Sequence, residues 1–192
     1  MTTIEEITAL LQGLPESTLE QVRTFVEFLK QKQDVAEATS WCYDFLENFR
    51  EAEISASRDP SGMETKIADA VCGGLTHLAL WEHPPVTGSG SVGYLVAIPP
   101  GVRRVRLKFS IGIRDGSELP NDRFVAFRVL VNGWKLWSAV KNRTGWEDHE
   151  VAMPQLASDV VRVEFVTDGL GQHKWDWAVW GQPRLEAETS EG

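Results

Sequence analysis

Hydrophobic residues recur every three to four positions through residues 3–56, which is the period of an amphipathic helix. A first short run begins at Thr3 and Glu6, which have the spacing of a capping box, and it ends near Gly13. A second run follows Pro15, and a third starts near Asp34. The third run would place these residues on one helical face: Trp41, Cys42, Phe45, Leu46 and Phe49. The pattern predicts about three helices in an acidic region over residues 1–56.

The hydrophobic period changes from 3.6 to 2 after a polar stretch that contains Pro60 and Gly62. We therefore expect a linker at residues 57–72. Seven runs rich in β-branched and aromatic residues follow: 75–83, 92–100, 102–113, 123–137, 146–154, 160–168 and 175–185. Such runs, separated by turn residues, predict an antiparallel β-sandwich of jelly-roll type over residues 73–185. Residues 186–192 read as a disordered acidic tail. The expected fold is mainly β with a helical N-terminal region.

The charge is unevenly distributed along the 192 residues, whose net charge is −9. Residues 1–70 hold 6 Lys and Arg against 14 Asp and Glu, and an acidic segment of this kind repels a polyanion. We therefore expect no nucleic-acid partner. No apolar run approaches the length of a membrane span, and the N-terminus carries acids where a secretory signal would be basic. These features predict a cytoplasmic protein with no membrane partner and two reduced cysteines, with Cys42 packed on its helix.

Motifs of common enzymes are missing from the sequence. It contains no GxGxxG directly after a strand and no Walker loop, GxSxG or HExxH, so we predict that the chain is not an enzyme. A small hydrolase would need two carboxylates facing each other across a cleft, and the sequence cannot show that pairing. No cofactor is predicted, although Asp115, Asp122 and Asp168 could contribute to a calcium site.

Tryptophan is concentrated in the strand-rich half, which holds seven of the eight. A flat indole can stack on the apolar face of a sugar ring while polar neighbours bind the hydroxyls. Alternation within the strands predicts that Trp137 and Trp177 lie in the core, whereas Trp134 and Trp146 stand beside turn residues. The predicted ligand-binding residues are His83, Trp134, Trp146, Lys174 and Trp175, with Asp168 and Asp176 orienting loops or accepting hydrogen bonds.

A series of short motifs resembles the NPCBM-type module of the galactose-binding-like β-sandwiches, over about residues 74–185. The motifs are WEHPP at 81–85, IPPG at 98–101, LKFSIGIRDGS at 107–117, FRVLVNGWKLW at 127–137, VRVEFVTDG at 161–169 and DWAVWGQPRL at 176–185, with Trp146 before a short strand. Such modules are attached to glycoside hydrolases and other sugar-active proteins, so the resemblance implies carbohydrate binding. Fold alone does not determine the ligand.

Residues 4–33 resemble short bacterial helical segments of unknown or antitoxin-like function, which implies that this region pairs with a partner helix or with a second copy. Two functions remain open. The first is a non-catalytic module that binds a glycan or a glycosylated partner and docks through residues 1–56. The second is an intracellular protein scaffold that uses the same sandwich without binding sugar.

Overall fold

A computed structural model describes residues 11–15, 18–19, 22–23, 40–154, 160–171 and 173–189. The chain divides into two compact units, one of residues 1–39 with 191–192 and one of residues 40–190. The helices predicted before residue 40 fall almost entirely outside the described residues. Within the described part of the chain, no helix has the length and apolar character needed to cross a membrane.

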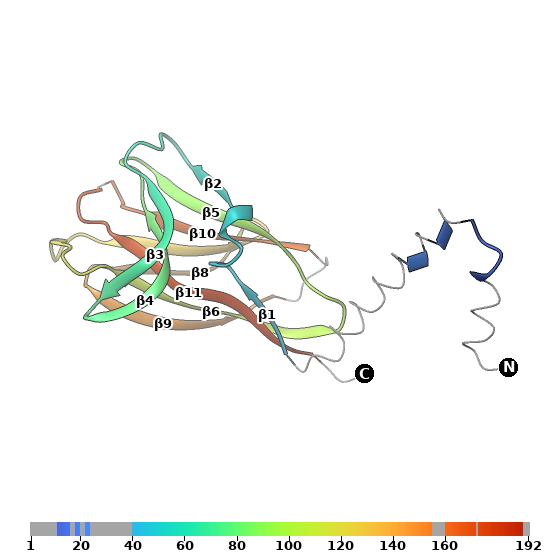
Figure 1. The fold of residues 1–192 in the computed structure, drawn as a ribbon. Coiled ribbons are helices and arrows are strands. Elements are labelled where there is room, and N and C mark those ends of the chain that lie inside the picture. The colour runs from blue at the N-terminus through green and yellow to red at the C-terminus, as the bar shows by residue number, and fades with distance from the viewer. Residues whose placement is uncertain are drawn as a thin grey trace. The chain divides into compact units, whose positions relative to one another are not determined.

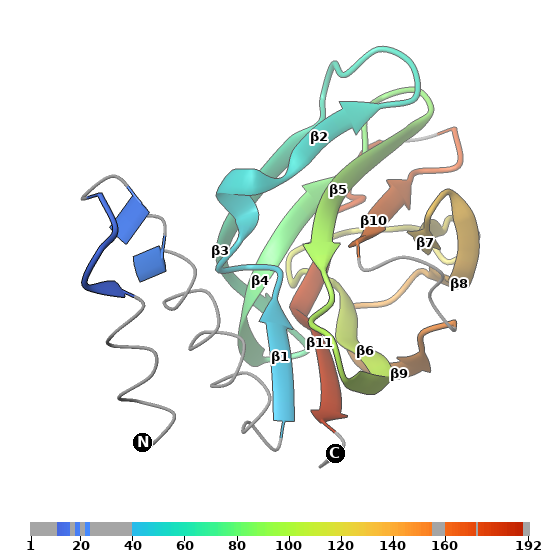
Figure 2. The same ribbon diagram turned by 90° about the vertical axis from the view of Figure 1, so that its right-hand side faces the viewer.

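The described residues of the second unit form an antiparallel sandwich of two β-sheets (Figures 1 and 2). Sheet A contains six strands, in the order β3–β4–β11–β6–β9 with β1 also paired to β11, and sheet B contains five, in the order β2–β5–β10–β7–β8. Sheet A consists of β1 (Ser40–Asp44), β3 (Glu64–Cys72), β4 (Leu75–His83), β6 (Val102–Ile113), β9 (Gly145–Ala152) and β11 (Ala178–Thr189). Sheet B consists of β2 (Glu53–Ala56), β5 (Ser89–Ala97), β7 (Val125–Val131), β8 (Trp134–Lys141) and β10 (Val160–Asp168); a 3-10 turn, η1 (Phe49–Glu51), precedes β2. The predicted all-antiparallel sandwich is confirmed.

The sandwich begins and ends further out than the sequence pattern predicts. Residues 40–44, expected in the third helix, pair with β11, and residues 53–56 pair with β5. Trp41 and Tyr43 pack against the core together with Phe45, so these residues follow the period of a strand rather than that of a helix. Cys42 consequently lies on the exposed face instead of packing.

Two further segments, predicted as a linker and a disordered tail, are also strands of sheet A. Most of the predicted linker is strand β3, which pairs with β4 along its whole length. The first residues of the predicted acidic tail continue β11 to Thr189, where Glu186 binds Lys108 of the neighbouring strand at 2.6 Å. Backbone pairing with a neighbouring strand, β4 for the first segment and β6 for the second, determines the structure of both segments.

The core lies between the two sheets and is dominated by aromatic rings. Phe165 of β10 contacts Phe45 and Trp180 edge-on or tilted, with centroid distances of 4.9 and 5.0 Å, and Phe127 meets Trp180 at 5.2 Å. Alternate residues of each strand point inward, so the polar side chains between them face outward. The largest fully buried side chain of the described residues is Trp180, on β11.

Glu82 of β4 is an unusual member of this core because it is fully buried. The indole N–H of Trp180 donates to Glu82 Oε2 at 2.6 Å, while the hydroxyl of Thr167 donates to the Glu82 backbone carbonyl at 2.8 Å. Burial raises the pKa of Glu82 well above its ordinary value. Burial therefore favours the neutral form of this carboxyl, to which Trp180 donates its hydrogen bond.

The outer face of sheet A carries a second, smaller cluster. Ala70, Cys72, Ala79 and Val179 are buried there, with Trp81 and Trp146 packed against them. The β3–β4 hairpin curls over this face until Gly73 approaches Gly145. A Cβ on Gly112 would lie 2.7 Å from Cys72 Sγ and 2.8 Å from the Trp146 ring, so only glycine fits beneath the hairpin.

Asp115 holds the tip of this hairpin. Its carboxylate accepts hydrogen bonds from the backbone N–H groups of Gly73 and Gly74 at 2.7 and 2.8 Å, and the backbone N–H of Asp115 donates to Val71 O.

We expect Asp115→Ala to lower the free energy of unfolding by about 1–3 kcal/mol, because two donors lose a charged acceptor. It should also increase hydrogen exchange at Gly73 and Gly74, measured by NMR. Asp69→Ala, an exposed substitution on the same hairpin, is the control, and equal stability of the two variants would contradict the role of Asp115.

Candidate functional site

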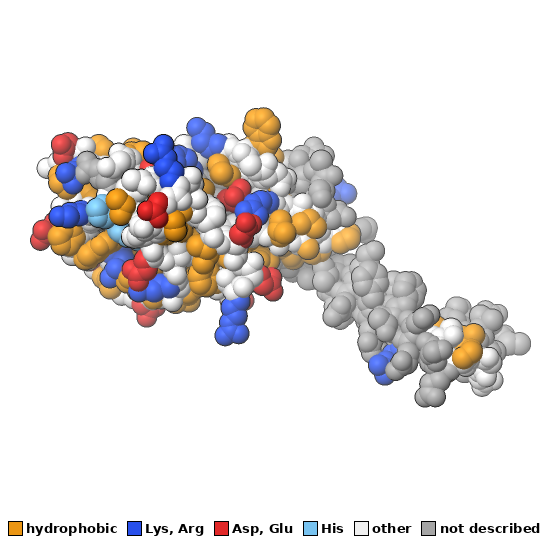
Figure 3. Space-filling view, turned by 90° about the horizontal axis from the view of Figure 1, so that it is seen from above, with side chains coloured by type: hydrophobic (Ala, Val, Ile, Leu, Met, Phe, Trp, Pro, Cys, Tyr) orange, Lys and Arg blue, Asp and Glu red, His pale blue; other side chains and the backbone are white. Residues whose placement is uncertain are grey.

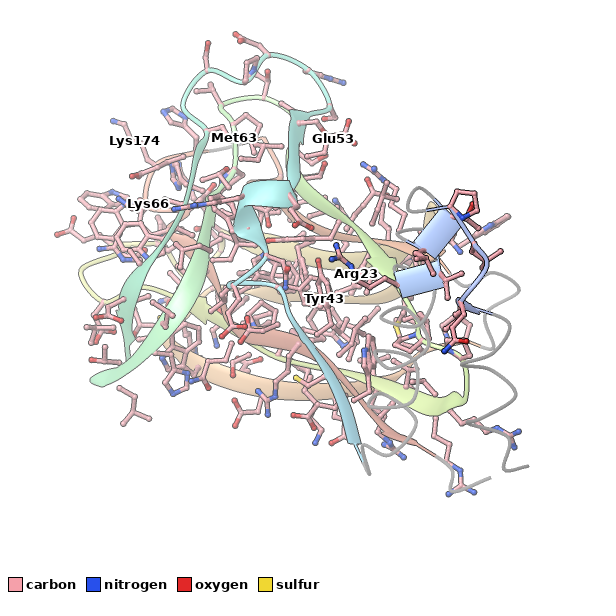
Figure 4. The ribbon with its side chains drawn as sticks, turned by 45° about the vertical axis from the view of Figure 1, so that its right-hand side comes forward. Arg23, Tyr43, Glu53, Met63, Lys66 and Lys174 are labelled. Carbon is pink, nitrogen blue, oxygen red and sulfur yellow. The ribbon has the colours of Figure 1, made fainter. Side chains whose placement is uncertain are left out.

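One end of the sandwich gathers the loops that follow β2, β4, β6, β8 and β10. The pairing register places the ends of these strands together, since Ile113 pairs with both Ala178 and Gly145 and Asp168 pairs with Ser89. We refer to this as the loop end. Lys66 of β3 and Lys174 of the β10–β11 loop both lie there, on the side of the β3–β4 hairpin (Figure 4). Seen from above, a histidine lies among basic and hydrophobic side chains at the left-hand end of the molecule (Figure 3).

A cavity of about 220 Å³ opens at the loop end. It is lined by Glu64, Trp81, His83, Arg114 and Trp177, with Ala178 at its base. Register explains the gathering, because Glu64 pairs with His83 and the backbone N–H of Arg114 donates to Trp177 O at 3.1 Å. Three separate segments of chain thus supply two indoles and three polar side chains to one small space.

Arg114 lies on aromatic surface. Its guanidinium carbon is 3.5 Å from the ring centroid of Trp81 and 5.1 Å from that of Trp177. The Lys66 ammonium lies 4.0 Å from the same Trp81 ring, and the Trp81 N–H donates to Ala68 O at 3.2 Å. Both cations are attracted by the electron-rich ring face. Trp81 is therefore fixed in place and holds Arg114 at the wall of the cavity.

His83 contributes a neutral ring. Its Nδ1 lies 2.7 Å from the backbone carbonyl of Asp176, and since a carbonyl can only accept, Nδ1 carries the proton. Burial lowers the pKa of His83 below its ordinary value, which keeps the imidazole neutral near pH 7. Nε2 is then left as a hydrogen-bond acceptor on a ring that lines the cavity.

Asp176 lies behind His83 and is 1% exposed. Its Oδ2 is buried and has no hydrogen-bond partner, and burial raises the pKa of Asp176 from 3.8 to about 6. The side chain is held against the loop after β6, where Arg123 favours its charged form. Asp176 therefore positions His83 through its carbonyl, and its carboxyl does not line the cavity.

The seven residues predicted from the sequence do not form one surface. His83, Asp176, Lys174, Trp175 and Asp168 all lie at the loop end, but only His83 lines the cavity. Trp175 packs on Trp177 at 5.3 Å, and Asp168 is paired with Arg128 at 3.2 Å and accepts from Leu170 N.

The other two predicted residues lie elsewhere. Trp146 stands on the outer face of sheet A, where it stacks on His77 at 4.7 Å and donates to Leu75 O. Trp134 is 81% exposed, as expected, but it follows the β7–β8 turn at the opposite end of the sandwich. Trp177, expected in the core, is only partly buried and lines the cavity.

Four cavity residues were missed by sequence reasoning: Glu64, Trp81, Arg114 and Trp177. Glu64 lay in the supposed linker, so its pairing with His83 was not foreseeable from local pattern. Trp81 and Arg114 stand at the ends of β4 and β6, and the motifs WEHPP and IRDGS marked these ends without indicating that they meet. The one available signal was their position at or directly after strand ends, where binding residues are common.

Two larger grooves, of about 470 and 380 Å³, cross the outer face of sheet A. Both are lined by Lys108, and most of the ionic groups within them are paired, Lys108 with Glu186 and Arg106 with Glu150 at 2.5 Å. The exposed Arg104, which lines the larger groove, has no carboxylate partner among the described residues. Charges that satisfy one another leave little to bind a ligand. The smaller cavity at the loop end is the better candidate because Arg114 and His83 Nε2 keep free bonding capacity.

Two of the three acids considered for calcium form contacts within the protein, and the third, Asp122, is exposed. Asp115 holds Gly73 and Gly74, and Asp168 pairs with Arg128. Among the residues that the structure describes, no group of three or more His, Cys, Asp or Glu is arranged to hold a metal ion.

No protein-family model matches this chain, and no curated protein is similar to it in sequence. Similar folds occur among solved structures. The tandem CBM51 modules of Sp3GH98, the family 98 glycoside hydrolase from Streptococcus pneumoniae SP3-BS71, align with a TM-score of 0.51 and 16% identity over 75% of this chain, which spans 49% of that one. The chain has a β-sandwich fold similar to that of these CBM51 modules. The family-level NPCBM assignment remains a prediction.

Two other solved structures have similar folds. TmCBM27, a carbohydrate-binding module with specific mannan recognition, has a TM-score of 0.49 at 16% identity, and the alignment covers 79% of this chain and all of that one. The Stig cyclase Fisc from Fischerella sp. TAU has a TM-score of 0.47 at 14% identity, over 78% of this chain and 90% of that one. Because a shared fold does not determine function, the function of this chain is argued from its site.

The buried carboxyl of Asp176 predicts a pH dependence of stability. The Asp176 carboxyl has a pKa of about 3.8 in the unfolded chain and about 6 in the folded one. The free energy of unfolding of the wild type should therefore fall by up to about 3 kcal/mol between pH 4 and 7, relative to that of Asp176→Asn. Below pH 4 both states hold the proton and this contribution vanishes. Denaturant unfolding at pH 4, 5, 6 and 7 measures the difference, with exposed Asp122→Asn as the control. If the free energies of unfolding of the wild type and Asp176→Asn changed with pH in parallel, the carboxyl would not take up a proton in the folded state over this range.

Proposed function

We infer that this protein is a non-catalytic module that binds a glycan, with the loop-end cavity as its ligand site. The observation that carries this proposal is the meeting of Trp81 and Trp177 with His83, Arg114 and Glu64 around one small cavity. A volume of about 220 Å³ is smaller than typical drug-sized pockets and suits a single sugar ring or the end of a chain.

The chemistry of the cavity matches that of a sugar. A hydroxyl both donates and accepts hydrogen bonds; Arg114 supplies donors, and His83 Nε2 and Glu64 supply acceptors. The indoles provide apolar walls for the C–H face of the ring. The walls are held by contacts that exist without ligand, so little ordering is required on binding.

The cavity has one carboxylate where glycoside hydrolysis commonly needs two, and this favours a binding role. Within the described lining, Glu64 is the one acid, and it is paired with Lys66 at 2.6 Å. Glycosidases of the common type place two carboxyl groups about 5 to 10 Å apart across the scissile bond. Asp176, the nearest alternative, is buried behind His83.

A glycan array probed with the full chain tests this function. We expect specific binding that Trp177→Ala weakens at least tenfold, because the variant loses one apolar wall. Trp134→Ala is the matched control, since it removes a more exposed indole at the opposite end and should bind as the wild type does. His83→Phe, which deletes the acceptor, provides a second test if Trp177→Ala lowers the melting temperature. A blank array with folded protein would reject glycan binding, and loss of binding only in Trp134→Ala would move the site to the β7–β8 turn.

Trp134 favours a second candidate function, that of a protein scaffold. An indole that is 81% exposed at a hairpin tip resembles the aromatic anchors of protein interfaces. The predicted docking region at 1–56 cannot supply residues 40–56 as free helix, because they are built into the two sheets.

If the chain self-associates through the β7–β8 turn, Trp134→Ala should convert a dimer into a monomer in analytical ultracentrifugation. A wild type that is monomeric at all concentrations would reject this association.

A further inference from the structure

Arg114 differs from the other basic side chains that are wholly or partly buried in the described residues. Each of these pairs with a carboxylate within 4 Å: Lys66, Lys108, Arg128, Lys141, Arg162 and Arg184. Arg123 has no such pair but acts on the buried carboxyl of Asp176. Arg114 contacts the rings of Trp81 and Trp177, and no acceptor for its guanidinium N–H groups lies among the described residues.

The groups around Arg114 compensate its charge only in part. Glu64 lines the same cavity and its charge acts on Arg114, but its carboxylate is ion-paired with Lys66 at 2.6 Å and not with Arg114. The carboxylate of Asp115, next along the chain, is occupied by Gly73 and Gly74. Burial raises the pKa of the nearby Cys72 thiol to about 12, so this group is neutral. Burial also lowers the pKa of Arg114, and the nearby Cys72 and Glu64, which act in the opposite direction, offset this only in part.

We propose that the loop-end cavity selects a saccharide carrying an anionic group, a carboxylate or a sulfate, which Arg114 binds. The proposal rests on the proposed glycan-binding function and names its ligand class. A guanidinium presents donors in a planar fork that matches two oxygens of a carboxylate or sulfate. Stacking on Trp81 fixes that fork before the ligand arrives, while His83 Nε2 accepts from a hydroxyl of the same sugar.

Matched pairs of sugars test this selection by titration calorimetry on the full chain. The probes are methyl glucuronide against methyl glucoside, methyl galacturonide against methyl galactoside, and galactose 6-sulfate against galactose. We expect at least one acidic sugar to bind at least tenfold more tightly than its neutral counterpart, with affinity that falls as salt is raised. The uronides and the sulfate together show which anion is preferred.

Arg114→Gln should abolish the preference, so that the acidic and neutral members of a pair bind alike. Arg106→Gln, on the outer face of the same strand, is the control and should keep it. If Arg114→Gln lowers the melting temperature strongly, the Nε–H signal of Arg114 in the wild type should shift on titration with the acidic sugar and not with the neutral one.

The outcomes separate this proposal from the function on which it rests. Equal binding of acidic and neutral sugars would overturn the anionic ligand class while leaving glycan binding intact. A preference for acidic sugars that survives Arg114→Gln would overturn the role of Arg114. No binding of any sugar in the array or the titrations would overturn the glycan-binding function itself.

Discussion

Trp180 of β11 points into the sandwich, where its N–H donates to the buried Glu82 of β4. Val179 and Gly181, on either side of it, face outward beneath the β3–β4 hairpin. Strand β11 is thus buried on both faces, and β4, β6 and β1 all pair with it. Both the main core and the small outer cluster require this strand to be in place.

Burial on both faces also explains the location of the cavity. A hairpin that curls over sheet A has to be held at its tip, and Asp115 does this from the loop after β6. Arg114, one residue earlier, is brought against Trp81, which belongs to the curled hairpin. The same arrangement that shields the outer cluster places an arginine on an indole at the loop end.

The charges of sheet A show how a site can be distinguished from a stable surface. Lys108 and Arg106 face carboxylates on neighbouring strands, and Arg184 pairs with Glu186 of its own strand. Partly exposed pairs of this kind contribute little to stability, but their charges cancel one another. Arg114 has no such partner and lies on aromatic surface. Unused hydrogen-bonding capacity, more than cavity size, therefore directs attention to the loop end.

Alternation of side chains along the chain was sufficient to predict the antiparallel sandwich and the strands from residue 75 onward. It was sufficient because most of these strands alternate buried and more exposed side chains along at least part of their length. Residues 40–72 were misread as helix and linker, since their apolar spacing fits either period and their pairing partners lie far along the chain. The exposed Trp134 could be foreseen from the Asn132–Gly133 turn, and both residues have the positive φ that such a turn requires.

The composition of the cavity was decided by tertiary structure alone. The sequence identified His83 and a surplus of tryptophans, but it could not show that Glu64, Trp81, Arg114 and Trp177 meet. Their meeting depends on the curl of the β3–β4 hairpin and on register between strands that are distant in sequence. Such long-range pairing leaves no local pattern, because each residue alone reads as an ordinary member of a strand end.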